Sequence, residues 1–392
     1  MRFHSSVSQQ EDSRQAVDEV IAAARAETDG KVDVVFAFLT AQHHDDAEMM
    51  LERLWLELDP QAVVGCSAEG VIGGESEIES GPGLAVLAAR LGPGVRVHPF
   101  HIGSDDWRGL LGDQDELRQR LGAGAETRAI IGLGDPFTTP VNQLLPAIDS
   151  ACLDAPLVGG MASSARKPGG NVLLRNDQIF DDGFVGVSLS GAIEVQTVVS
   201  QGCRPIGKPM LVTKARENVI EQLGGRAALG VLRETVSELP ESEQDLLQHG
   251  LFVGQAISEY RQSWNRGDFL VRNIIGADEQ VGSLAVADYV RVGQTVQFHV
   301  RDASTADEDL SLMLQPQAQA PSQAAGALLF SCNGRGTRLF DQPCHDVGLS
   351  RRMMPRTPVA GFFAAGELGP VGRRNFIHGH TASFALFRPK QA

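Results

Sequence analysis

One pattern recurs three times along the chain: an apolar run is followed, after a connection, by a second apolar strand that ends at a glycine. Each copy starts with the apolar run and continues through a polar or helical connection to the glycine strand. The distance from the first run to the glycine is about 30 residues, the length of a strand–helix–strand crossover. Glycine at a strand end lets another backbone or a ligand approach closely. The three copies are Val32–Leu39 with Gly65, Arg128–Leu133 with Gly159, and Gly326–Cys332 with Gly361.

The remaining pattern predicts further helices and strands on both sides of a boundary near residues 225–245. Helical periodicity marks 13–27 and 45–58, and strands are expected near 84–90 and 95–102. The runs 171–175, 184–189 and 193–201 predict an antiparallel meander. Thr213 is placed to cap a helix that carries Ala215, Val219, Ile220 and Leu223.

Four strands are predicted beyond the boundary, at 251–257, 269–275, 284–290 and 295–301. The stretch 314–326, rich in Gln, Ala and Pro, predicts a mobile surface loop. The expected fold is mixed α/β: two modules with strand–helix–strand units and antiparallel meanders, and glycine-rich turns at strand ends. Such turns are expected to converge at one edge, where α/β sheets bind their ligands.

Charge and hydropathy narrow the range of partners. The chain has 34 Lys and Arg against 49 Asp and Glu, a net charge of −15. This argues against a nucleic acid or an anionic membrane as partner. The N-terminal stretch MRFHSSVSQQEDSRQ lacks an apolar signal core. No apolar run approaches the roughly 18 residues of a membrane span, so we expect a soluble, cytoplasmic protein.

The cysteines suit neither a disulfide framework nor a structural zinc site. They are odd in number and none stands in a Cys-x-x-Cys pair, so we expect reduced thiols and no cofactor. Cys332 is kept as a candidate nucleophile, because Arg335 is near in sequence and a histidine could fold beside it. The alternative is a small buried apolar residue. The five are Cys66, Cys152, Cys203, Cys332 and Cys344.

A positive stretch interrupts this acidic chain. Between residues 335 and 374 there are seven arginines against three carboxylates. One interpretation is a solvated helix face around Arg351 and Arg352. The other is a small anion site, because the guanidinium fork fits carboxylate or phosphate.

The turn CNGRG is the centre of the anion-site interpretation. Arg335 lies between Gly334 and Gly336, where turn N–H groups and Asn333 could surround a bound anion. The alternative is an arginine paired with a nearby acid such as Asp341.

Two histidines near the C-terminus offer a further constellation. His378 and His380 are two apart, so in a strand both would point to one face. With Glu367 they could hold a divalent metal. The alternative is a pocket wall in which the imidazoles hydrogen bond to backbone or ligand.

Hydroxyl groups complete the predicted site, because serines stand in the other two glycine turns. No metal is assigned beyond the candidates just named. The predicted ligand-binding residues are Cys66, Ser67, Glu69, Ser163, Ser164, Cys332, Asn333, Arg335, Glu367, His378, His380 and Thr381.

With these residues laid out, the chain resembles the FIST family (F-box and intracellular signal transduction proteins) from about residue 30 to residue 387. The motifs VVGCSAEG, LVGGMASS and SQGCRPIG resemble its N-terminal module. FLVRNIIG, FSCNGRG, GFFAAGELGP and HGHT resemble its C-terminal module. The predicted organisation is an N-terminal helix at 1–29, from its amphipathic pattern, followed by modules at 30–225 and 226–387, which the resemblance implies.

The family is regarded as a sensory or ligand-binding module, with amino acids among the proposed ligands. Bacterial relatives occur alone or joined to signalling output domains, and a eukaryotic member carries an F-box. The segment before the first strand is too short for an F-box and no output domain is seen, so we expect a separate signalling partner.

We therefore expect an intracellular sensor of a small anionic metabolite, such as an amino acid. Arg335 would pair with the anion and Glu367 with an ammonium group. The ligand would be oriented by His378, His380, Asn333 and Ser67. The alternatives are an adaptor that binds protein without a ligand, and an enzyme that uses Cys332 or a His-bound metal.

Overall fold

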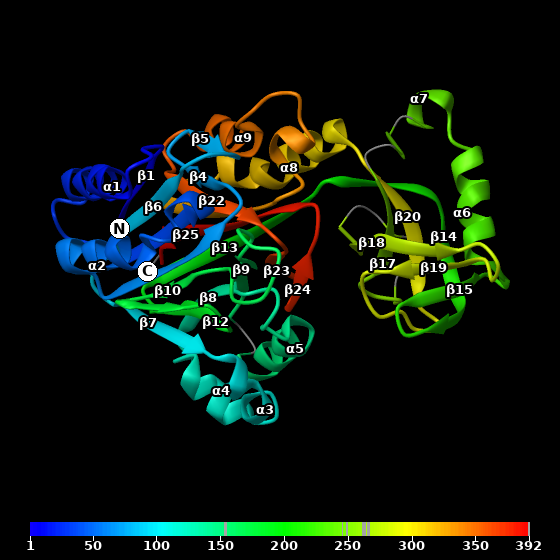
Figure 1. The fold of residues 1–392 in the computed structure, drawn as a ribbon, viewed down its shortest axis with the longest axis horizontal. Coiled ribbons are helices and arrows are strands. Elements are labelled where there is room, and N and C mark those ends of the chain that lie inside the picture. Colours follow the sequence, from blue (N-terminus) through cyan, green and yellow to red (C-terminus); the bar gives the residue numbers. More distant parts are fainter. Residues whose placement is uncertain (153–154, 245, 248–249, 261–263, 265–266, 391–392) are drawn as a thin grey trace. The chain divides into compact units, whose positions relative to one another are not determined.

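The computed structural model describes residues 1–152, 155–244, 246–247, 250–260, 264 and 267–390. The chain divides into two compact units, whose helices and strands are labelled in Figure 1. Unit 1 comprises Met1–Val199, Leu310–Ile377 and Thr381–Ala392, and unit 2 comprises Ser200–Asp309 and His378–His380. The predicted module boundary near residue 225 falls inside unit 2, so the two units divide the chain differently from the two predicted modules.

Unit 1 contains three copies of one order of elements: edge strand, outer helix, strand, helix, parallel strand, hairpin and return strand. The first copy is β1 (Arg2–Ser8), α1 (Ser13–Glu27), β2 (Val34–Thr40), α2 (Ala47–Leu58), β3 (Ala62–Ala68), β4 (Val71–Gly73), β5 (Ser76–Ile78) and β6 (Leu84–Arg90). The second is β7 (Val95–Ile102), α3 (Trp107–Leu110), α4 (Gln114–Arg120), β8 (Thr127–Gly134), α5 (Val141–Ala151), β9 (Leu157–Met161), β10 (Leu173–Arg175), β11 (Gln178–Phe180) and β12 (Phe184–Gly191).

The third copy is interrupted by unit 2, which lies in sequence between its edge strand and its outer helix. It consists of β13 (Ile193–Gln201), α8 (Ala303–Ala318), β21 (Gly326–Cys332), α9 (His345–Met353), β22 (Val359–Ala364), β23 (Glu367–Val371), β24 (Arg374–His378) and β25 (Thr381–Pro389). The strand of the apolar run pairs in parallel with the glycine strand in each copy: β2 with β3, β8 with β9, and β21 with β22. This confirms the three predicted crossovers.

Each sheet of unit 1 is completed by a hairpin from another copy. The strand orders are β1-β6-β2-β3-β10-β11, β7-β12-β8-β9-β23-β24 and β13-β25-β21-β22-β4-β5. The hairpin of the first copy therefore joins the third sheet, that of the second joins the first, and that of the third joins the second. This cyclic exchange links the three copies into one folding unit.

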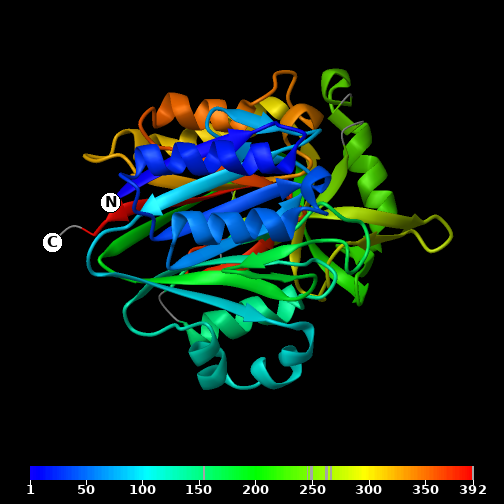
Figure 2. The ribbon, with the colours of Figure 1, turned by 60° about the vertical axis from the view of Figure 1, so that its left-hand side comes forward.

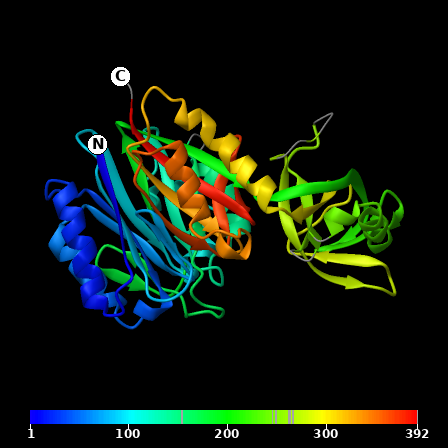
Figure 3. The ribbon, with the colours of Figure 1, turned by 90° about the horizontal axis from the view of Figure 1, so that it is seen from above.

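The three sheets share one inner core and each is covered outside by its own helices. Phe38 of the first sheet packs on Phe362 of the third, with ring centroids 5.0 Å apart, and Ile131 of the second joins the same cluster. The alternate residues Val35 and Leu329 point outward to the helices. Figure 2 shows α1 and α2 (blue) over the first sheet, and Figure 3 shows α8 and α9 (yellow to orange) beside the third. Both faces are buried, which explains the unbroken apolar runs in the sequence.

The three strand glycines are required by close backbone approach. A Cβ added at Gly65, Gly159 or Gly361 would lie 1.9, 1.7 or 1.7 Å from a carbonyl oxygen of the parallel neighbour. Real side chains do not fit at such distances. The recurring glycine of the sequence pattern is therefore a packing requirement of each parallel strand pair.

Unit 2 is a closed barrel. Its strands are β14 (Cys203–Arg216), β20 (Thr295–Arg301), β17 (Leu251–Ala256), β18 (Phe269–Asp278), β19 (Ser283–Val286) and β15 (Val219–Leu223), and a β14–β15 pairing closes the ring. Register shifts in β14 at Ile206/Met210 and Val212/Lys214 bend this strand so that it pairs with both neighbours. The remaining elements are β16 (Arg226–Ala227), α6 (Ala228–Ser237) and α7 (Glu241–Gln244).

The structure confirms the mixed class, the helices at 13–27 and 45–58 and the four strands beyond the boundary, and corrects three other predictions. The runs 171–175, 184–189 and 193–201 form no meander, because they enter three different sheets. The helix predicted after Thr213 is the β14–β15 hairpin, whose buried Val212, Ile220 and Leu223 fill the barrel core instead of a helix face.

The first part of the predicted 314–326 loop is helical. Helix α8 continues to Ala318 through Pro316, because Ala306, Leu310 and Leu314 repeat every fourth residue and are fully buried. No helix within the described ranges is long and apolar enough to cross a membrane.

Candidate functional site

The three glycine turns meet at one end of unit 1. The Glu69 amide donates a hydrogen bond of 2.9 Å to Ser163 Oγ, whose own hydroxyl donates to the Phe363 carbonyl. The Met161 amide donates to the Gly366 carbonyl at 2.8 Å. The turns after β3, β9 and β22 are thus held together directly, at the carboxyl ends of the parallel strands.

Ser67 and Ser164, both predicted to contact a ligand, belong to a buried polar network. Their hydroxyl oxygens are 2.6 Å apart, and Ser164 donates to Asn171 Oδ1 at 3.0 Å. Asn171 Nδ2 donates in turn to Asp135 at 2.9 Å. Because these hydroxyls are engaged within the protein, they join two copies of the repeat rather than line an open site. Cys66 is fully buried in the shared core, where burial raises the pKa of its thiol.

Arg335 is not an open anion contact, contrary to the expectation from its glycine-flanked turn. It is 1% exposed, and its Nε and Nη2 donate to the two carboxylate oxygens of Asp346 at 2.7 Å each. Its guanidinium also lies 5.2 Å from the Phe340 ring centroid. The partner is an acid, as the alternative anticipated, but it is Asp346 on α9 rather than Asp341.

Two buried carboxyls flank this ion pair. Burial raises the pKa of Glu77 to about 8, with Asp346 adding to the rise, and raises the pKa of Glu367 to about 8. Burial would also raise the pKa of Asp346, but Arg335 and His345 outweigh it, and the net shift is downward.

Glu367 consequently does not suit the ammonium contact assigned to it. It is fully buried and protonated near neutral pH, and its Oε2 accepts hydrogen bonds from the Thr381 amide at 3.2 Å and hydroxyl at 2.7 Å. Thr381, predicted to contact a ligand, therefore donates its hydrogen bonds to a buried carboxyl group of the protein.

A small pocket with a volume of about 170 Å³ lies at the same turns. It is lined by Glu69, Gly70, Glu79, Ser80, Asn333, Thr337, Arg338 and Phe363. Two of these, Glu69 and Asn333, are among the predicted site residues. The pocket lies where the turns after β3 and β21 meet, which is the expected edge of an α/β sheet.

Arg338 is the cation of this pocket. Its side chain is 54% exposed, pairs with Glu69, and donates from Nη1 to the Asn333 carbonyl at 2.7 Å. Opposite it, Glu79 accepts from the Thr337 amide at 2.9 Å and hydroxyl at 2.7 Å. Gly336, with φ +59°, admits the Glu79 carboxylate, which would lie 2.5 Å from an added Cβ. Sequence reasoning missed Arg338 although it lies in the arginine-rich stretch, and nothing in the sequence marked Glu79.

The two predicted histidines do not share a strand face. Strand β24 ends at His378, which is buried, and His380 follows with φ +62°. His380 belongs to unit 2, where its Nε2 lies 3.0 Å from Asn273 Oδ1 and its ring packs on Phe252 at 4.3 Å. In the part of the chain that the structure describes, no three His, Cys, Asp or Glu side chains gather in a set that could hold a metal.

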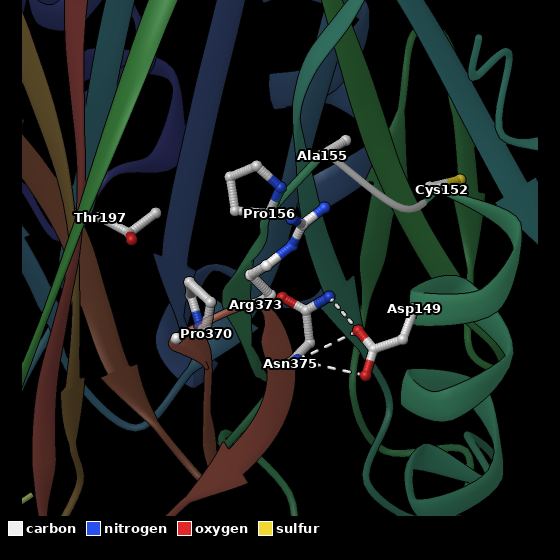
Figure 4. Close-up of a pocket in the computed structure, with 9 residues that line it drawn as sticks. Asp149, Cys152, Ala155, Pro156, Thr197, Pro370, Arg373 and Asn375 are labelled. Atoms are coloured by element: carbon white, nitrogen blue, oxygen red, sulfur yellow. Dashed lines mark hydrogen bonds between the residues drawn. The ribbon is translucent and has the colours of Figure 1, made fainter. Parts of the chain in front are cut away.

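A larger hollow of about 260 Å³ lies elsewhere in unit 1, where α5 ends and β9 begins (Figure 4). Asp149 in its wall accepts from Asn375 Nδ2 at 2.6 Å, and Asn375 Oδ1 accepts from the Leu157 amide at 2.9 Å. Figure 4 shows the Arg373 side chain beside this pair. The hollow lies at the amino end of β9, whereas α/β sheets bind their ligands at the carboxyl ends of their strands, so we favour the smaller pocket as the functional site.

Comparison with known proteins gives close relatives of the whole chain. It is 39% identical over 389 residues to an uncharacterized protein of Mycobacterium tuberculosis, covering 99% of this chain and 100% of the relative. An uncharacterized protein of Mycobacterium bovis matches equally well, at 39% identity with 99% of each chain covered.

Among solved structures, a cyanuric acid hydrolase of A. caulinodans aligns at 12% identity and a TM-score of 0.18, over 76% of this chain and 99% of that one. Two family models cover most of the sequence: the FIST N domain matches residues 33–226 and the FIST C domain matches residues 228–370. The chain therefore belongs to the FIST-domain family.

Proposed function

We propose that this protein is a stand-alone sensor that binds a small zwitterionic metabolite, such as an amino acid, in the pocket between Glu69, Glu79 and Arg338. FIST domains are associated with signal transduction. The observation that carries the proposal is one exposed guanidinium beside two carboxylates, at the carboxyl ends of parallel strands.

The charges of the pocket match a zwitterion. A ligand carboxylate would take the place of Glu69 on Arg338, because the guanidinium fork can donate hydrogen bonds to one carboxylate as readily as to another. The ammonium group would then lie against Glu69 and Glu79. Exchange is inexpensive, because an exposed ion pair such as Arg338–Glu69 contributes about 0–1 kcal/mol.

The size of the pocket limits the ligand. At about 170 Å³ it is below the range of about 300–1,000 Å³ typical of drug-sized ligands. A compact amino acid or short organic acid fits this volume better than a nucleotide. The Arg335–Asp346 pair, whose side chains are almost fully buried, fixes the turn that carries Asn333 and Arg338.

A thermal-shift screen against amino acids and short organic acids tests the proposal. A true ligand at 100 times its Kd should stabilise the protein by about 2.7 kcal/mol. The shift should disappear in Arg338→Gln and persist in Arg351→Gln, the matched control, because Arg351 is also exposed and paired, with Glu75. A ligand whose effect survives Arg338→Gln would refute the assignment.

A second candidate function, a protein-binding adaptor, is favoured by the surface of unit 2. Both tyrosines of the chain are exposed there, Tyr260 at 100% and Tyr289 at 72%. Leu211, Ile275, Val281 and Val292 are also exposed on this unit. Tyrosine is enriched at protein interfaces, so the barrel would be the surface that contacts a separate signalling partner. The adaptor function would be favoured if no ligand shifts the melting temperature and if a purified partner binds the wild type but not Tyr289→Ser.

A further inference from the structure

Cys332 has surroundings that differ from those of the other cysteines. It ends β21, is 7% exposed, and its Sγ accepts a hydrogen bond from the Gly334 amide at 3.5 Å. Arg335 and Arg338 both interact electrostatically with it. The thiolate is the reactive form of cysteine, and cationic neighbours and an N–H donor stabilise it against the opposing effect of burial.

Two buried polar atoms beside this thiol have unused hydrogen-bonding capacity. Among the residues that the structure describes, the buried donor Arg335 Nη1 has no acceptor, and the buried Glu367 Oε1 has no N–H or O–H neighbour in hydrogen-bonding position. The Cys332 thiol is itself a hydrogen-bonding neighbour of the Glu367 carboxyl. Buried polar groups are normally satisfied, so these atoms indicate a place for a small polar molecule next to the sulfur.

We propose that Cys332 is a redox-modification site that hydrogen peroxide oxidises to a sulfenic acid. Arg335 Nη1 and the Glu367 carboxyl would hydrogen bond the two peroxide oxygens and align one of them with the sulfur. The inference does not depend on the ligand proposed for the neighbouring pocket.

The step balances with the groups at hand. The Cys332 thiol releases its proton to solvent, and the thiolate attacks one peroxide oxygen, so that an S–O bond forms as the O–O bond breaks. The departing hydroxide takes the proton of the Glu367 carboxyl and leaves as water, and Glu367 regains a proton from solvent. The sulfur loses two electrons and the peroxide gains them; overall, thiol and peroxide give sulfenic acid and water. A dithiol reductant returns the sulfenic acid to the thiol, releasing water and a disulfide.

The other cysteines provide an internal comparison. Cys152 is more exposed than Cys332, yet burial raises the pKa of its thiol to about 11, against a smaller opposing effect of Arg118. Cys66 is fully buried and has its pKa raised by burial. If environment governs reactivity, Cys332 reacts before the more accessible Cys152.

The test is a peroxide titration of the reduced protein in the presence of dimedone, with each cysteine peptide quantified by mass spectrometry. We expect Cys332 to be labelled at least about tenfold faster than Cys152, and dithiothreitol added before dimedone to remove the label. Labelling of Cys152 first, or an unlabelled Cys332 at doses that label Cys152, would overturn the proposal.

Two variants separate chemistry from accessibility. Glu367→Gln keeps the shape of a side chain that is neutral near pH 7 but removes the proton donor, and should slow Cys332 labelling about tenfold. Arg338→Gln removes a cation that interacts with the thiol and should move the pH profile of labelling upward. The charged or titratable groups that remain near this turn include Arg335, Asp346, Glu77 and Glu367, together with Glu69 and Glu79 beside position 338. Unchanged rates and pH profiles in both variants, with unchanged melting temperatures, would refute the roles assigned here.

Discussion

Two arginines three residues apart have opposite roles at the same end of unit 1. The side chain of Arg335 is 0% exposed and locked onto Asp346, whereas that of Arg338 is 54% exposed and paired with Glu69 on the rim of a pocket. Both belong to one turn and both have a carboxylate partner. They differ in burial: the buried Arg335 keeps its partner and stabilises the fold, whereas the exposed Arg338 can exchange its partner.

The largest expected difference between the two pairs is in stability. Asp346→Ala leaves Arg335 buried and uncompensated and should destabilise unit 1 by about 3–5 kcal/mol. Chemical denaturation followed by circular dichroism would measure this. A loss below about 1 kcal/mol would mean that Arg335 is not held as the structure shows.

The buried layer should also make stability depend on pH. The pKa of Glu367 is raised to about 8 in the folded state, so the protonated carboxyl stabilises the fold below pH 4.5 and this contribution is lost as pH rises towards 8. The slope should be on the order of 1 kcal/mol per pH unit for this group. Melting temperatures of the wild type and Glu367→Gln between pH 5 and 8 test it, because the variant lacks the titration. Parallel pH curves for the two proteins would contradict the assignment.

The smallest effect is expected on the rim. Glu69→Gln removes the exposed partner of Arg338 and should change the free energy of unfolding by less than about 1 kcal/mol. The same denaturation measurement applies. A loss comparable to that of Asp346→Ala would show that the rim pair is structural and would abolish the contrast.

The sequence predicted the framework of unit 1 because its signals are local. An apolar run and a glycine are enough to identify a parallel strand pair, and the backbone clash at Gly361 explains why the glycine recurs. The helix predicted after Thr213 failed because its apolar spacing also suits a bent hairpin in a barrel. No periodicity could show that hairpins are exchanged between copies, since pairing partners lie far apart in the chain.

The site was only partly predictable for the same reason. The arginine-rich stretch and the glycine turns located the region, and Glu69 and Asn333 do line the pocket. Arg335 is the buried arginine because it pairs with Asp346 on α9. The residues of the CNGRG turn do not indicate that this helix packs against them. Glu79 enters from the first copy of the repeat and meets Thr337 only through tertiary structure.

The most direct test of the account is a crystal structure with the ligand that emerges from the stability screen. We predict its carboxylate on Arg338, with Glu69 displaced and the Arg335–Asp346 pair unchanged. A ligand bound instead beside Asp149 and Arg373, or one that breaks the buried pair to reach Arg335, would contradict the division into a fixed buried pair and an exchangeable pair at the pocket.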